Sequence, residues 1–171
     1  MEKWSSKHEH LNLDYENIVL QLKGLLEKGH DLQLHIHPHW ETAQFENGAW
    51  EFEMDGHYKL ADFDDDQVRQ IVTKYKNKLE EITGHPVKGF RAGGWCLQPF
   101  ARFKEIFKKA GIKVDSTVFQ GAHMHTEHYY FDFRNAPDKG RYRFENDLCE
   151  ENKDGSFLEL PIGGYRYLPG F

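Results

Sequence analysis

Helical segments alternate with short apolar runs along this chain, and that alternation constrains the fold more than any other feature. Apolar residues recur at helical spacing over residues 14–28, 67–82 and 98–111. Short apolar runs of strand character occupy residues 32–36, 87–91, 112–119 and 156–162. Alternation of this kind favours a mainly parallel sheet with helices packed outside it. The sequence therefore predicts an α/β protein.

Residues that begin and end helices flank the first two helical segments. Asp14 is a candidate N-cap for the first, and Gly29 follows it as a stop. The acidic run 64–66 precedes the second, where negative charge suits the start of a helix, and Gly84 ends it. The expected buried stripe of this second helix is Val68, Ile71, Val72, Tyr75, Leu79 and Ile82.

An acidic and aromatic segment separates the first strand from the second helix. Within it, "GAWEFEMDGHYKLADF" has the pattern of two short strands around a turn at Asp55 and Gly56. We expect a hairpin insertion at about residues 45–63, close to the end of the first strand.

Size, charge and cysteine content narrow the function classes. A chain of 171 residues makes one domain, and a net charge of -6 argues against nucleic acid or an acidic membrane surface as a partner. Cys96 and Cys149 could form at most one disulfide and no four-thiolate zinc site. Neither a signal-peptide core nor a membrane span is visible, so the chain is expected to be cytoplasmic as written.

A histidine cluster stands at the exit of the first strand, in "GHDLQLHIHPHW". His35 and His37 project from one face of a straight strand and could share a metal ion. A bend at Pro38 would instead bring His35 and His39 together, so spacing alone leaves both pairings open. Imidazole without thiolate is typical of hydrolytic divalent-metal sites, and an Asp or Glu should supply the missing ligand. Trp40 is a candidate for stacking on a sugar ring.

Three segments together resemble the NodB homology domain of polysaccharide deacetylases, carbohydrate esterase family 4, over roughly Leu13 to Pro161. "GHDLQLHIHPHW" is similar to the family's HxxxH metal motif, which implies His35 and His39 as ligands and excludes His37. "GFRAGGW" looks like the arginine motif, which implies that Arg91 orients a catalytic carboxylate and Trp95 walls the substrate groove. "GIKVDSTVF" places Asp115 where the family has an aspartate near the pocket.

The resemblance implies a partial or distorted (β/α) barrel that forms one domain over residues 1–171. It also implies a hydrolase that removes N- or O-acetyl groups from a carbohydrate, with water activated on a divalent ion. Zinc is the expected metal, with cobalt, nickel or manganese as alternatives. A carbohydrate is the expected partner, and a homo-oligomer could cover exposed sheet edges.

Two family motifs are missing, which leaves an alternative function open. The TFDDG-like motif, which supplies the catalytic base and third metal ligand, and the closing histidine motif are both absent from the sequence. His123, His125 and His128 could replace the acid, although "AHMHTEH" also suits a solvated loop. The alternative is a catalytically incompetent fragment, or a carbohydrate- or metal-binding domain, of the same fold. A different metal-dependent hydrolase is a third hypothesis.

Overall fold

A mainly parallel sheet forms the centre of the molecule, as the sequence predicts. The computed structural model describes residues 8–164. Their central sheet has five strands in the spatial order β1 (Leu34–Ile36), β4 (Gly89–Ala92), β5 (Val114–Asp115), β9 (Phe157–Glu159) and β8 (Tyr142–Phe144). The first four strands are parallel, and β8 pairs with β9 in the antiparallel sense. The prediction of an α/β protein with a mainly parallel sheet is confirmed.

The sheet is open, which differs from the barrel that the family resemblance implies. Strands β1 and β8 stand at its two edges and do not pair with each other. The remaining strands form two separate hairpins, β2 (Gln44–Glu46) with β3 (Ala49–Glu51) and β6 (His123–His125) with β7 (Tyr130–Asp132). Residues 8–164 therefore contain no closed barrel.

Helix α3 (Asp65–Thr83) follows the sequence prediction closely. The Asp64 carboxylate accepts a hydrogen bond from the backbone N–H of Gln67, while the Gln67 side chain accepts one from the Asp64 backbone. This reciprocal cap satisfies two N–H groups that have no partner within the helix. Gly84, with φ of 68°, ends the helix in the left-handed conformation.

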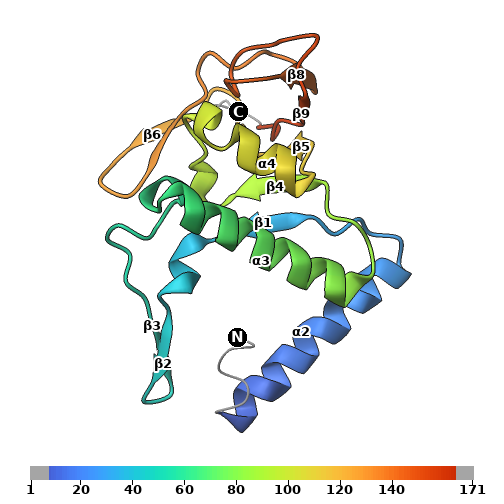
Figure 1. Ribbon diagram of the computed structural model, residues 1–171, viewed down its shortest axis with the longest axis vertical. Coiled ribbons are helices and arrows are strands. Elements are labelled where there is room, and N and C mark those ends of the chain that lie inside the picture. The colour runs from blue at the N-terminus through green and yellow to red at the C-terminus, as the bar shows by residue number, and fades with distance from the viewer. Residues whose placement is uncertain (1–7, 165–171) are drawn as a thin grey trace, which may run out of the picture.

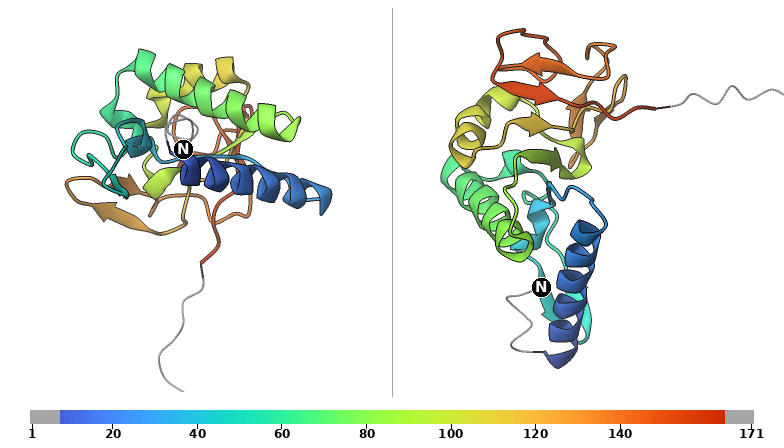
Figure 2. Two further views of the ribbon diagram at one scale, coloured as in Figure 1. Left: turned by 90° about the horizontal axis from the view of Figure 1, so that it is seen from below. Right: turned by 90° about the vertical axis from the view of Figure 1, so that its right-hand side faces the viewer.

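Helices α3 and α4 (Lys104–Ala110) lie side by side against one face of the sheet (Figure 2). Aromatic rings fill the space between this face and α4. They are Phe90, Phe100, Phe107, Phe144 and Phe157, each at most 2% exposed. Burial of these rings stabilises the packing of α4 on the sheet.

The helix expected over residues 98–111 is shorter than predicted. A 3-10 turn at Phe100–Arg102 precedes α4, which begins only at Lys104 and ends before Gly111. Pro99 comes just before the 3-10 turn, and a proline ring cannot continue helical hydrogen bonding on its N-terminal side. The apolar spacing was correct, but it spans two helical pieces rather than one.

Helix α2 (Glu9–Glu27) begins earlier than the predicted N-cap at Asp14, and His8 takes the N-cap position. It ends as predicted, because Lys28 and Gly29 donate backbone hydrogen bonds to the last carbonyl groups. The helix extends away from the sheet and contacts α3 (Figure 1). Tertiary contact with α3 outweighs the weak local signal at Asp14.

The predicted hairpin insertion exists, but its turn is not at Asp55 and Gly56. Strands β2 and β3 pair across Asn47 and Gly48, which both have positive φ, at 51° and 81°. Asn-Gly is the strongest sequence signal for a two-residue hairpin turn, because both residues tolerate the left-handed region. The hairpin extends away from the central sheet in Figure 1, and Asp55–Gly56 forms a turn without flanking strands.

Other predictions concern cysteines and membranes. Cys96 and Cys149 are both free thiols. Within residues 8–164, no helix is long and apolar enough to cross a membrane. The N-terminal stretch that lacks a signal-peptide core falls partly in residues 1–7, which lie outside the described residues.

Candidate functional site

The first strand places His35 at the carboxyl edge of the sheet, on the face opposite the helices. Leu34 and Ile36 are buried, whereas His35 between them is exposed. Parallel pairing with β4 sets His35 directly beside Arg91, which is also exposed. Ligands of open α/β sheets bind at the carboxyl ends of strands, so this edge is where a functional site is expected.

His35 and His37 meet through their ring nitrogens. The Nε2 atoms are 3.0 Å apart, and His35 Nδ1 lies 2.9 Å from the carbonyl oxygen of Arg91. Because a carbonyl oxygen only accepts hydrogen bonds, Nδ1 of His35 carries a proton, and its Nε2 atom faces His37. The Arg91 carbonyl thus orients His35 in the way that outer-shell acceptors orient metal-binding histidines.

His39 lies apart from this nitrogen contact. It belongs to a 3-10 turn at Pro38–Glu41, where its ring stacks on Tyr58 with centroids 5.8 Å apart and an interplanar angle of 8°. Its Nδ1 atom is buried, and no hydrogen-bond partner among residues 8–164 reaches it. The structure therefore brings together the strand pair His35 and His37, and His39 contributes ring contacts.

The surroundings of His37 and His39 favour the neutral form of both rings. Burial lowers the pKa of His37, and the nearby His35 and His39 lower it further through charge repulsion. Burial also lowers the pKa of His39. Both rings are consequently biased toward the neutral form, which can accept a proton or bind a metal.

The histidine pair fits part of a metal centre. Two nitrogens bound to one tetrahedral zinc ion at its usual distances lie about 3.3 Å apart, close to the observed separation. However, residues 8–164 contain no group of three or more His, Cys, Asp or Glu side chains arranged to hold a metal ion. A catalytic zinc ion needs three protein ligands, so the described residues supply two positions and lack the third.

Close packing makes glycine necessary in the turn after β4. A Cβ atom at Gly93 would lie 2.5 Å from the carbonyl oxygen of Ile36 and 2.9 Å from His37 Nδ1. At Gly94, which has φ of 61°, it would meet the Tyr58 hydroxyl at 2.6 Å. The two glycines let this turn approach the histidine strand directly.

Of the two predicted aromatic residues, Trp40 lies beside the histidine pair. A cavity of about 170 Å³ is lined by His35, Ile36, His37, Trp40 and Tyr75. Trp40 is 39% exposed and packs edge-on against Phe52 with centroids 4.8 Å apart. One ring surface therefore stands at the mouth of the histidine site.

Trp95 does not line that cavity. It packs against Phe119 and Phe131 with centroid distances of 5.8 and 5.6 Å. Its φ of 59° is unusual for a bulky residue and costs conformational energy. Backbone strain of this kind often accompanies functional sites, and the predicted role of Trp95 as a groove wall remains a prediction.

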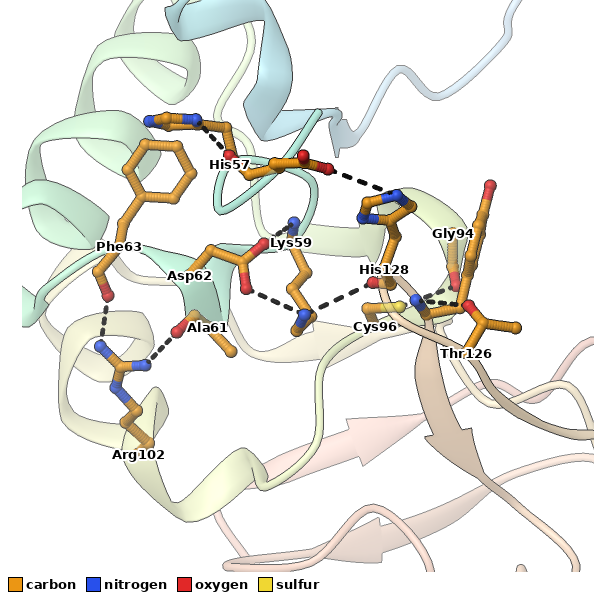
Figure 3. A network of polar contacts seen from close by, with 12 residues as sticks. His57, Lys59, Ala61, Asp62, Phe63, Gly94, Cys96, Arg102, Thr126 and His128 are labelled. Carbon is orange, nitrogen blue, oxygen red and sulfur yellow. Dashed lines mark hydrogen bonds and ion pairs between the residues drawn. The ribbon is translucent and has the colours of Figure 1, made fainter. Parts of the chain in front are cut away.

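A polar network ties the segment after the β2–β3 hairpin to the β6–β7 hairpin (Figure 3). Lys59 Nζ pairs with Asp62 at 2.9 Å and donates to the His128 carbonyl at 3.4 Å, while Asp55 lies 3.6 Å from His128 Nε2. His123 and His125 are exposed on β6. Within the described part of the chain, none of these histidines contacts His35 or His37.

Arg91 and Asp115 occupy opposite faces of the sheet. The Arg91 guanidinium donates from Nε to the Ser116 carbonyl and from one terminal nitrogen to the Ser116 hydroxyl, both at 2.8 Å. It lines a second cavity of about 840 Å³ together with His35 and Ser116. Asp115 is 1% exposed on the helix-covered face. Its predicted catalytic role stays a prediction.

Glu159 is a buried acidic residue that sequence patterns did not indicate as part of a site. Its side chain is 0% exposed, and its position on β9 pairs with Asp115 on β5. A glutamate flanked by apolar residues in "FLELP" was the available signal, because a charged side chain in a buried strand needs a specific partner.

Comparisons with known proteins add a likeness of fold. No protein-family model matches the chain, and no curated protein matches it. A crystal structure described as a "putative polysaccharide deacetylase from Mycobacterium smegmatis" shares 20% identity with a TM-score of 0.48, over 91% of this chain. This chain spans 42% of the length of that protein, and a likeness of this strength carries no conclusion about activity.

Proposed function

We propose that the protein is a hydrolase that removes N- or O-acetyl groups from a carbohydrate with the help of a divalent ion bound at the end of β1. Zinc is the preferred ion, and cobalt, nickel and manganese are alternatives. The observation that carries the proposal is the contact between Nε2 of His35 and Nε2 of His37, at 3.0 Å, in a cavity shared with Trp40.

Each residue has a role that follows from its contacts. A bound divalent ion would supply Lewis-acid polarisation of the acyl carbonyl. The Arg91 carbonyl orients His35, whose Nε2 then faces His37. Trp40 offers an exposed ring on which a sugar face can stack. The catalytic base and the third ligand would be a carboxylate that the described arrangement does not bring to the histidines.

A binding domain without catalysis is the second candidate. This candidate is favoured by one observation: among the described residues, His35 and His37 lie together, but no third metal ligand lies with them. Such a domain would bind a metal ion weakly, or bind carbohydrate at Trp40, and would release no acetate.

Removal of either strand histidine tests the metal site. We expect His35→Ala and His37→Ala each to weaken zinc binding by about tenfold or more, because each leaves a single imidazole. His39→Ala should retain most of the affinity, since its ring stacks on Tyr58. Isothermal titration with zinc measures the effect, and His123→Ala on β6 is the matched control.

The family resemblance predicts the opposite order for two of these variants. Loss of affinity in His39→Ala with little change in His37→Ala would favour the His35 and His39 pairing over the strand pair. If the wild-type protein binds no divalent ion at all, the metal-dependent function is wrong.

Truncation of Trp40 tests the substrate class. We expect the wild-type protein loaded with zinc to release acetate from N-acetylglucosamine oligomers. Trp40→Ala should raise KM by about three- to tenfold, the loss expected when one aromatic contact is removed. Tyr130→Ala is the control, because Tyr130 is 44% exposed but lies on β7. Zinc binding without acetate release would support the binding domain instead.

A further inference from the structure

Two buried carboxyl groups share a contact at the carboxyl edge of the sheet. Asp115 on β5 and Glu159 on β9 are paired residues of neighbouring parallel strands, with exposures of 1% and 0%. The Asp115 carboxyl group acts electrostatically on that of Glu159 and, with burial, raises the pKa of Glu159. Two ionised carboxylates cannot share a contact without water, so one of them must carry a proton.

The hydrogen bonds of Thr117 identify Asp115 as the ionised partner. The backbone N–H of Ala92 donates to the Thr117 hydroxyl oxygen at 3.0 Å, so the hydroxyl proton is free to point elsewhere. That hydroxyl donates to Asp115 Oδ1 at 2.8 Å, and the Thr117 N–H donates to Asp115 Oδ2 at 2.9 Å. Burial raises the pKa of Asp115, but both of its oxygens accept hydrogen bonds, and these favour the charged form.

The environment of Glu159 assigns the proton to it. Glu159 Oε1 accepts a hydrogen bond from the backbone N–H of Val118 at 3.1 Å. Glu159 Oε2 is buried, and no N–H or O–H donor among the described residues reaches it. A buried oxygen without a donor is costly, and protonation removes that cost by turning the oxygen into a donor toward Asp115.

We infer that Glu159 is a neutral carboxylic acid at neutral pH, that it donates its proton to ionised Asp115, and that this pair positions Arg91 through Ser116. Ser116 lies in the chain between Asp115 and Thr117, which are hydrogen-bonded to each other. Its carbonyl and hydroxyl groups accept both hydrogen bonds from Arg91, and its hydroxyl donates to the Leu160 carbonyl at 2.8 Å. Glu159 is therefore a positioning residue for Arg91.

The charged and titratable groups around the pair agree with one negative charge. Arg91 on β4 is the cation that acts on both carboxyl groups. Burial and the adjacent Asp115 raise the pKa of Glu159 to about 11. Tyr142 on β8 and Cys149 also face the pair, and burial raises the pKa of each, so both are neutral.

A carboxyl titration on the wild-type protein tests the protonation state. With ¹³C-labelled glutamate, the Glu159 carboxyl resonance should stay at the position of a protonated acid through neutral pH, far above the usual value of 4.5. Glu159→Gln assigns the signal by its disappearance. An ionised Glu159 resonance at pH 7 would overturn the inference.

The positioning role needs a second readout, which is hydrogen exchange at Arg91 Nε. Glu159→Gln keeps an acceptor for Val118 and a donor for Asp115, so Arg91 exchange should stay within about twofold of wild type. Glu159→Leu removes both and should speed exchange by about tenfold or more. Glu150→Leu, at an exposed glutamate, is the control.

Equal exchange rates in the Gln and Leu variants, or loss of Arg91 protection in Glu159→Gln, would refute the positioning role. If Glu159→Leu does not fold, loss of Arg91 protection in Glu159→Gln still refutes the positioning role, and the wild-type titration decides the protonation state. Neither readout involves metal binding or acetate release, so failure here is distinct from failure of the proposed function.

Discussion

Replacement of Gly93 by alanine should destabilise the protein by about 3 kcal/mol and weaken the contact between β1 and the turn after β4. The new Cβ atom would lie 2.5 Å from the Ile36 carbonyl oxygen, a backbone atom that cannot rotate away. It would also lie 2.9 Å from His37 Nδ1. Relief requires the two strands to separate or the His37 ring to move, and either change disturbs the histidine pair.

Urea unfolding measures the stability change, and zinc titration measures the effect on His37. Gly140→Ala is the matched control, because a Cβ atom there would meet nothing within 4 Å and its φ is not positive. That variant should stay within about 0.5 kcal/mol of wild type. Equal stabilities for the two variants would mean that β1 and the turn can separate without cost.

The stability of the protein should fall as pH rises from 7 to 8. Glu159 has a folded-state pKa of about 11 and a usual value of 4.5, so in this window the folded state holds a proton that the unfolded state has released. A raised folded-state pKa gives stability that is complete below the unfolded value and is lost as pH rises toward the folded value. One such group lowers the folding equilibrium constant by up to about tenfold per pH unit.

Between pH 7 and 8, the contribution of Glu159 to the pH dependence of stability can be distinguished from those of His37, His39 and Cys96. The lowered pKa values of His37 and His39 give stability that is already complete above their usual value of 6.5. Cys96, whose usual value is 9.0, contributes mainly above the window. Urea unfolding at each pH should show a flat profile for Glu159→Gln. The same slope in wild type and variant would contradict this assignment.

Local chemistry predicted those elements whose signals lie within a few residues. The acidic run before α3 became its cap through Asp64, and Gly84 ended that helix. The Asn47-Gly48 turn was a hairpin signal, but the pattern around Asp55 predicted the turn at the wrong place. Pro99 precedes a helical pattern that spans two pieces, although its spacing predicted one helix. These errors come from competing local signals and could be corrected from the sequence.

The candidate site was also predictable only in part from local sequence. A histidine cluster at the end of β1 was predictable, because strand alternation brings His35 and His37 to one face. The position of His39 relative to this pair depends on the 3-10 turn at Pro38–Glu41 and on the stacking of its ring against Tyr58. Because Tyr58 is distant from His39 in the chain, residue spacing could not predict this contact.

Sequence periodicity was sufficient to establish an α/β fold with parallel strands and a polar carboxyl edge, since these properties follow from the order of helices and strands. The open sheet and the register that sets Asp115 beside Glu159 were not accessible in this way. Register depends on backbone pairing between strands far apart in the chain, and the groups packed around a buried carboxyl set its pKa. Folding therefore converts an inconspicuous glutamate in an apolar strand into a partner of Asp115.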